Sequence, residues 1–282
     1  MRALLDVHSM IRCGEETIII PKLASLLKYP PTIEKRYEAA KLSKNLIRKA
    51  IGTAILTVIE GHGNPAPILC NKDPLTMKNS VELSRIFKNS KYIFMIRDGR
   101  AVVHSLISRG ITVSGFDLSD YEQCLEKWNW LIMQMNDECK TLGKSQCLPV
   151  LYEQLILHPK SELTRILNFL GVPWEDAVLN HHKAVGKEIS ISKLEWSNDQ
   201  IAKPINLEAL TKWVDFFPTH LRLNVASIAP ALFDFGYDVK SYPPNYGNPD
   251  ATVINNTLLI KNDKSYWNSI VEKFKRKPPI AS

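Results

Sequence analysis

Two adjacent carboxylates follow a glycine in the segment Cys13-Gly14-Glu15-Glu16-Thr17. Acidic residues in such a position are common at a helix N-terminus, where negative charge is favourable to the helix dipole. The alternative is a general base: a phenol has a pKa of about 10, so attack by its oxygen benefits from a carboxylate that accepts the proton. On this segment alone both interpretations stay open.

A second segment, Cys70-Asn71-Lys72-Asp73-Pro74, follows a short apolar run and precedes a helical pattern. Pro74 suits the first helical turn, with Asp73 as the N-cap. Lys72 then lies in the loop between strand and helix, where a catalytic cation could meet an anion. A solvated loop lysine is the more common case.

The third segment is Arg97-Asp98-Gly99-Arg100, at the end of an apolar run. Gly99 permits a tight turn, and Ser105 and Arg109, four apart, share a face of the helix that follows. A strand-end arginine beside a hydroxyl and a second guanidinium suits a phosphate group. Alternatively, Arg97 caps the strand by pairing with Asp98 or another carboxylate. We assign no role to His104 or to the pair His181-His182.

The elements that must position these residues follow from the apolar patterns. Short apolar runs predict strands at 66–70, Lys91–Asp98 and Leu148–Leu155. Longer patterns of period 3.6 predict helices, at Thr76–Phe87, Arg100–Arg109, Tyr121–Leu142 and Ser161–Leu170. Strands that alternate with helices predict a parallel sheet covered by helices, with ligands at the carboxyl ends of its strands.

Composition and charge narrow the class of protein. The 282 residues suffice for one large α/β domain or two small ones. Lys and Arg number 36 against 29 Asp and Glu, and this net charge of +7 favours anionic partners. Nucleic acid is disfavoured, because no basic run is interleaved with aromatic residues. Residues 241–256 hold few helix signals and are expected to wrap the surface, and residues 271–282 read as a basic, disordered tail.

The five cysteines include no CxxC pair, which makes a zinc site improbable, and their odd number leaves at least one thiol unpaired. Asn255-Asn256-Thr257 is an N-glycosylation sequon, which matters only in a secretory compartment. No apolar run of 18 residues predicts a transmembrane helix. Met1–Asp6 has none of the features of a signal peptide and reads as the inside of a helix.

Taken together, these motifs resemble the tyrosylprotein sulfotransferase family. The resemblance runs from Met1 to about Thr257 and is specific because the motifs recur in order. They are MRALLD, RCGEET, LCNKDP, FMIRDGRAVVHS, GFDLS, CLPVLYEQLILHP, NFLGVPW, SKLEWSNDQIAKPINLEALTKW and PPNYGNPD followed by VINNT. It implies one α/β domain over residues 1–270, with the three-layer sulfotransferase fold related to P-loop kinases, in which a central parallel sheet is flanked by helices.

The resemblance also implies an activity: in-line transfer of a sulfuryl group from 3′-phosphoadenosine 5′-phosphosulfate to tyrosine in acidic stretches of secretory proteins, with no metal required. Glu16 resembles the general base. Lys72 and Ser190 resemble the groups that stabilise charge on the leaving phosphate oxygen. The residues that resemble donor contacts are Arg97, Ser105, Arg109, Tyr152, Lys203 and the loop from Ser190 to Asp199, which includes Ser197. Those that resemble acceptor contacts are Thr17, Ile18 and Lys22.

For the cysteines, the resemblance implies the pairs Cys13–Cys70 and Cys139–Cys147, with Cys124 left over. Disulfides imply an oxidising compartment, and the family works in the Golgi lumen, anchored in the membrane. The same resemblance makes Asn255 a candidate glycosylation site and a homodimer a candidate assembly.

This sequence departs from the family pattern in three places. A Pro-Arg-Ser-Gly-Thr-Thr loop that binds the 5′-phosphosulfate, and the strand before it, would precede Met1, so we expect a missing first strand and weaker donor binding. Ile18 stands where the family has arginine, and Glu195–Asp199 differ beside the donor. The chain is therefore expected to be either an enzyme or a binding module that holds nucleotide or partner without turnover. A carbohydrate sulfotransferase is a third hypothesis, which a glycan acceptor assay would decide.

Overall fold

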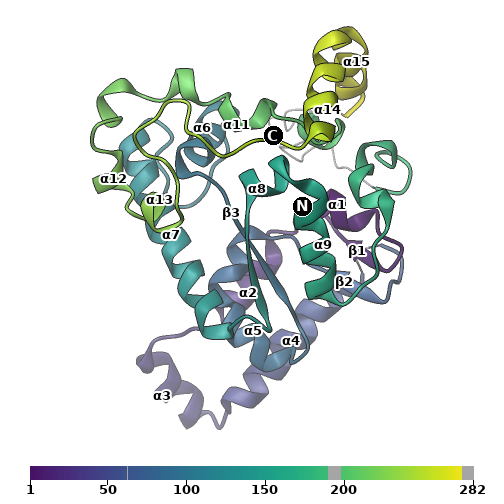
Figure 1. Ribbon diagram of the computed structural model, residues 1–282. Helices are drawn as coiled ribbons and strands as arrows, with labels where there is room; N and C mark the ends of the chain where they lie inside the picture. The colour runs from purple at the N-terminus through teal and green to yellow at the C-terminus, as the bar shows by residue number, and fades with distance from the viewer. Residues whose placement is uncertain (62, 190–197, 275–282) are drawn as a thin grey trace, which may run out of the picture.

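The computed structural model describes residues 1–61, 63–189 and 198–274. Its strands are β1 (Ile11–Cys13), β2 (Ile68–Cys70), β3 (Tyr92–Ile96) and β4 (Cys147–Leu151). They form two parallel ladders, β1 with β2 and β3 with β4, and helices flank both (Figure 1). The predicted α/β class with parallel strands is confirmed.

Helices make up most of the rest of the described chain. Those before β4 are α1 (Arg2–Asp6), α2 (Ile19–Ser25), α3 (Pro31–Ala39), α4 (Lys44–Glu60), the 3-10 helix η1 (Pro74–Asn79), α5 (Ser80–Ile86), α6 (Gly99–Arg109) and α7 (Tyr121–Leu142). Those after it are α8 (Tyr152–Leu157), α9 (Pro159–Leu170), η2 (Asp176–Leu179), η3 (His181–Lys183), α10 (Asn198–Ile201), α11 (Glu208–Thr211), η4 (Val214–Phe216), η5 (Thr219–Leu221), α12 (Val225–Ile228), α13 (Ala231–Asp234), α14 (Ala251–Asn262) and α15 (Lys264–Phe274).

The β3–β4 ladder is the centre of the core, because its two faces are packed by different clusters. Phe94 and Ile96 of β3 join the cluster around α7, whereas Ile93 and Met95 pack against the cluster around α1 and α9. Side chains alternate across a strand, so β3 is covered on both sides. This explains why its sequence reads as a continuous apolar run rather than an alternating one.

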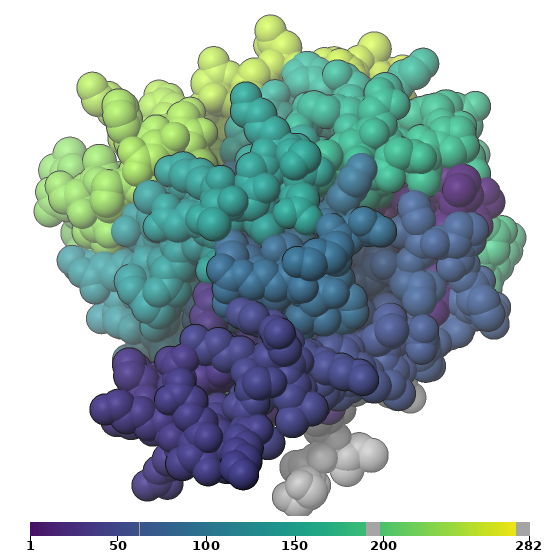
Figure 2. All heavy atoms as spheres, turned by 90° about the horizontal axis from the view of Figure 1, so that it is seen from below, coloured from purple at the N-terminus to yellow at the C-terminus, as the bar shows by residue number. Residues whose placement is uncertain are grey.

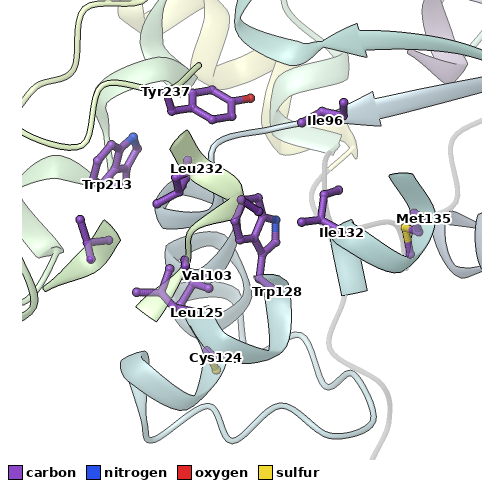
Figure 3. Packing of buried hydrophobic residues seen from close by; sticks show 14 of the residues in the cluster. Ile96, Val103, Cys124, Leu125, Trp128, Ile132, Met135, Trp213, Leu232 and Tyr237 are labelled. Carbon is purple, nitrogen blue, oxygen red and sulfur yellow. The ribbon is translucent and has the colours of Figure 1, made fainter. Parts of the chain in front are cut away.

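Helix α7 has the apolar face that its sequence predicts. Leu125, Trp128, Ile132 and Met135 lie on this face and are buried (Figure 3). The Trp128 ring also explains Gly99, because a Cβ added at Gly99 would lie 2.4 Å from that ring. We predicted that Gly99 would permit a tight turn, but it is the first residue of α6. Glycine is needed there because the Trp128 ring packs against it.

The predicted end of the last strand is wrong. The strand predicted at Leu148–Leu155 ends at Leu151, and Tyr152 begins α8. Leu155, Ile156 and Leu157 are all buried, and a short run that is buried on every side carries no period to separate strand from helix.

The C-terminal third contains more helix than predicted. Residues 241–249 do run without helix, but α14 begins at Ala251, directly after Asp250. Helix α15 continues to Phe274, so residues 271–274, which we placed in the tail, are helical. Seen from below, the dark blue segment that includes α3 and the yellow C-terminal helices lie at opposite edges of the view (Figure 2). No helix among the described residues is long and apolar enough to cross a membrane.

Candidate active site

The β1–β2 ladder brings the first two motifs together. Cys13 lies directly opposite Cys70 in the parallel register, and the two form a disulfide with their Cα atoms 4.5 Å apart. Both strands end at this bridge, so the loops that carry Glu16 and Lys72 leave from the same point. The bridge closes a separation of 57 residues, for which loop-closure entropy contributes about 4 kcal/mol. The predicted bridge Cys139–Cys147 also forms, and Cys124 is free and buried.

Glu16 and Lys72 are in contact beyond the bridge. The Lys72 Nζ donates to Glu16 Oε2 at 2.8 Å, and the two side chains are 31% and 42% exposed. A carboxylate and an ammonium therefore stand side by side at the carboxyl ends of two parallel strands, accessible to solvent. This arrangement can accept a proton and stabilise a developing negative charge within one small site.

Buried Asp73 fixes the two loops relative to each other. Its carboxylate accepts hydrogen bonds from the Thr17 hydroxyl at 2.8 Å and from the backbone N–H groups of Thr17 and Ile18 at 3.1 and 2.8 Å. We predicted that Asp73 would cap the helix that follows it, but its side chain makes no capping hydrogen bond there. It reaches across to the Glu16 loop instead. The Thr17 hydroxyl is thus occupied within the protein, and its contact with an acceptor stays a prediction.

The second group of predicted residues gathers at the end of β3. Arg97 stacks over the Tyr152 ring at 4.6 Å and donates to the Ala209 carbonyl at 3.1 Å. The Arg97 Nε is buried and has no hydrogen-bond partner among the described residues. Burial raises the pKa of the Tyr152 hydroxyl, while Arg97 opposes that rise, so this ring remains a neutral platform. Among the described residues Arg97 forms no ion pair with Asp98 or with another carboxylate, so the strand-capping alternative is not observed there.

Arg109 extends the positive region along α6. It makes a bidentate ion pair with Asp199, at 3.1 and 3.2 Å, and Ser105 lies one turn before it and is partly buried. Burial lowers the pKa of His104, and Arg97 and Arg109 lower it further. Arg97 and Arg109 thus both act on His104 and disfavour a further positive charge on its ring.

Lys203 approaches the same region from the other side. It pairs with Glu208 at 3.2 Å, and Glu208 neighbours Ala209, whose carbonyl binds Arg97. Burial alone would raise the Glu208 pKa, but Lys212 and Lys203 outweigh it and lower the pKa. The cluster of Arg97, Arg109 and Lys203, with a buried orphan donor and an aromatic platform, fits an anionic nucleotide. Ser190 and Ser197 lie outside the described residues.

A buried polar network, which no sequence pattern predicted, adjoins this cluster. The Arg100 side chain binds both carboxylate oxygens of Asp98, at 3.0 and 2.7 Å, and the Asp238 carbonyl at 2.8 Å. Glu153 accepts from the Asp98 N–H at 3.0 Å and from the Tyr237 hydroxyl at 2.8 Å. The Asp98 and Arg100 side chains are 0% exposed. The network fastens the C-terminal segment to the end of β3; only the unusual density of charge at 97–100 could have indicated it.

A further feature lies away from these clusters. A cavity of about 470 Å³ opens among α3, α4 and α5, and no predicted site residue lines it. Within the described ranges, no three His, Cys, Asp or Glu side chains group as a metal site would require.

Comparisons with known proteins agree with the fold. A sequence model described as "Sulfotransferase family" matches residues 1–176. A sulfotransferase domain from a Synechococcus PCC 7002 olefin synthase superposes with a TM-score of 0.53 at 20% identity, over 84% of this chain and 89% of that domain. A sulfotransferase domain from the curacin biosynthetic pathway gives 0.50 at 17%, over 80% and 90%. Fold and sequence model together define the class as a sulfotransferase.

Relatives with curated names narrow the class. The chain is 47% identical to protein-tyrosine sulfotransferase A of Caenorhabditis elegans over 95% of its own length and 71% of the relative's. It is 48% identical to protein-tyrosine sulfotransferase 2 of Gallus gallus, over 93% and 72%. With the Drosophila melanogaster protein-tyrosine sulfotransferase it shares 47% identity, over 95% of this chain and 55% of that protein. The chain belongs to the protein-tyrosine sulfotransferase family of enzymes.

Proposed function

We propose that this protein transfers a sulfuryl group from 3′-phosphoadenosine 5′-phosphosulfate to tyrosine hydroxyls of proteins in the secretory pathway. The observation that carries the proposal is the 2.8 Å contact between Glu16 and Lys72, held by the Cys13–Cys70 bridge and by Asp73. The arginine cluster at the end of β3 supports it, because the donor is a polyanionic nucleotide. Relatives at 47–48% identity are named protein-tyrosine sulfotransferases, which agrees with tyrosine as the acceptor.

In this proposal Glu16 accepts the phenolic proton while the tyrosine oxygen forms a bond to sulfur. The bond between sulfur and the bridging phosphate oxygen breaks, and Lys72 stabilises the negative charge that develops there, with Ser190 as a second group. In the free protein the two side chains neutralise each other. The contact holds the two groups side by side, and acceptor and donor replace it when they bind. Positioning and charge stabilisation are sufficient for such a transfer, as in phosphoryl transfer.

Arg97, Ser105, Arg109 and Lys203 bind the donor nucleotide, mainly its 3′-phosphate, and Tyr152 flanks Arg97. The carboxylates that now pair with these cations, Asp199 and Glu208, would yield part of their contacts to the phosphate. The donor itself supplies the activated sulfuryl group. The remaining chemistry is assigned to protein side chains, with no metal.

The compartment, modification and assembly belong to the same proposal. Two disulfides are favoured in an oxidising lumen, which agrees with the Golgi. Asn255 is exposed on α14 and could carry a glycan, whereas Thr257 of the same sequon is buried and bonds to Val253 and Leu207. Acidic tyrosine-containing proteins are the proposed partners, and a homodimer the proposed assembly.

Glu16→Gln tests the general base. It removes the proton acceptor while keeping the shape of the side chain, so we expect transfer to an acidic tyrosine peptide to fall on the order of 10²–10⁴-fold. Nucleotide binding, measured by calorimetry with adenosine 3′,5′-bisphosphate, should change little. Glu15→Gln is the matched control and should keep transfer. Equal loss of nucleotide binding in Glu16→Gln would make Glu16 structural.

A second experiment separates enzyme from binding module. Transfer is measured for this chain and for a chimera that carries, before Met1, the preceding segment of the Gallus gallus relative. Turnover by the chain alone supports the enzyme. Nucleotide binding without turnover in both proteins would favour an inactive binding module, and turnover only by the chimera would show that the chain needs that segment.

A further inference from the structure

Helix α2, which follows the Glu16 loop, has two apolar faces where an ordinary surface helix has one. Ile20 and Ala24, and Leu27 just after the helix, face the core and are 2%, 0% and 8% exposed. Ile19 and Leu26, by contrast, are 45% and 57% exposed. Single exposed apolar residues need no explanation, but several on one short helix beside a candidate catalytic carboxylate suggest a contact surface.

The exposed residues form a continuous stripe. Ile19, Lys22 and Leu26 are spaced by three and four residues, which places them on one side of a helix. Ile18, directly before the helix, is 62% exposed and extends the stripe toward Glu16. From the Glu16 end the stripe therefore presents two apolar side chains, then an exposed ammonium group, then a third apolar side chain. We call these four residues the α2 stripe.

The backbone at Ile18 is held in a conformation that a β-branched residue rarely adopts. Its φ of 60° and ψ of −21° lie in the left-handed region, which is sterically unfavourable for isoleucine. The hydrogen bond from the Ile18 N–H to Asp73, at 2.8 Å, holds it there. Strain of this kind persists only where the surrounding structure holds it, and it is concentrated at active sites and ligand-binding sites.

The α2 stripe is within reach of an acceptor at Glu16. Glu16 and Ile18 are two residues apart, which is at most about 7 Å of extended chain, so a residue next to an acceptor tyrosine at Glu16 can reach Ile18 and Ile19. Lys22 lies three residues further, about 4.5 Å along the helix axis. An apolar neighbour would bury surface against the isoleucines, whereas a carboxylate there would lose hydration without a partner. A carboxylate further out would meet the Lys22 ammonium.

We propose that the α2 stripe selects the acceptor: the enzyme prefers tyrosines that have an apolar residue next to them and an acidic residue further along the segment. This inference rests on the proposed function, because it takes Glu16 as the place where the hydroxyl binds. It makes Ile18 and Lys22 the residues that determine specificity.

Two peptides test the inference. They share one tyrosine and one distal aspartate and differ in the residue next to the tyrosine, leucine or aspartate. We expect kcat/KM to favour the leucine peptide on the order of tenfold. Ile18→Arg should reverse this preference by a similar factor, because the new charge attracts the adjacent aspartate and loses the apolar contact. Lys22→Ser should lower kcat/KM for both peptides, by raising KM more than by lowering kcat.

The matched control is Leu223→Arg, which introduces the same charge at an exposed leucine far along the chain. It should leave the ratio between the peptides unchanged. A wild-type preference for the aspartate peptide, or an Ile18→Arg variant with the wild-type ratio, would overturn the inference while leaving the proposed function intact.

Binding of the same two peptides with phenylalanine in place of tyrosine gives a readout that needs no turnover. If no peptide accepts sulfate but the phenylalanine peptides bind with the expected ratio, the proposed function fails and the α2 stripe stands as a peptide-binding surface. If these peptides bind without discrimination, the inference fails.

Discussion

The site is divided between two strand ends that are fastened in opposite ways. At the end of β1 and β2, Glu16 and Lys72 are accessible to solvent, and a covalent bridge and one buried carboxylate, Asp73, hold their loops. At the end of β3, the residues beneath Arg97 form a network of fully buried charges with no covalent link.

This difference follows from the length and packing of the strands. β1 and β2 have three residues each, which leaves few ladder hydrogen bonds to hold their loops in place. β3 and β4 have five residues each and lie between two apolar clusters. A short ladder needs a covalent link to position side chains that must stay exposed, whereas a long, buried ladder can support a polar network because water is excluded from it.

Breaking the buried network should have the largest effect on stability. Arg100→Met keeps the apolar volume beside Trp213 and Tyr242 but leaves the Asp98 carboxylate buried without its ion-pair partner. We expect a loss of about 3–5 kcal/mol in the free energy of unfolding, measured by urea denaturation.

Arg85→Met is the control for this variant, because Arg85 pairs with Glu82 at the surface and is 50% exposed. We expect its cost to stay within about 1 kcal/mol. Similar losses for the two variants would show that burial does not make the Asp98–Arg100 pair more important than an ion pair at the surface.

Removing the covalent link tests the other strand end. Cys13→Ser with Cys70→Ser should cost about 4 kcal/mol by the loop-closure argument. Cys139→Ser with Cys147→Ser, whose bridge spans only eight residues, should cost about 2–3 kcal/mol. The measurements are unfolding by urea and transfer rate corrected for the folded fraction.

Only the first pair of substitutions should also reduce transfer, since only that bridge positions Glu16 and Lys72. Loss of transfer in both variants alike would mean that the Cys13–Cys70 bridge acts through stability alone.

The sequence predicted one strand end far better than the other. The roles of Glu16 and Lys72 and both bridges came from motifs that match a family in order, and the α/β class came from the alternation of apolar periods. The contacts that join Asp98, Arg100 and Glu153 to Tyr237 and Asp238 span up to 138 positions, and no local period encodes such contacts. Gly99 shows the same limit: its neighbour Trp128 is distant in the sequence, so a turn was the only local explanation.

The smallest expected effect concerns pH and the buried network. Burial raises the pKa of Glu153, although its bonds to Asp98 and Tyr237 oppose the rise. A raised native pKa means that the folded state binds this proton more tightly than the unfolded state. Stability should therefore fall as pH rises from the unfolded pKa, about 4.3, to the higher native pKa.

Glu153→Gln removes this titration. Relative to the variant, the wild type should therefore lose free energy of unfolding as pH rises across that range, and the difference should then stay constant. The slope should not exceed about 1.4 kcal/mol per pH unit. Urea denaturation between pH 4 and 7 measures it, with exposed Glu126→Gln as the control that keeps the wild-type slope. If the wild type instead gains stability relative to Glu153→Gln over this range, the hydrogen bonds from Asp98 and Tyr237 stabilise the Glu153 carboxylate more than burial penalises it.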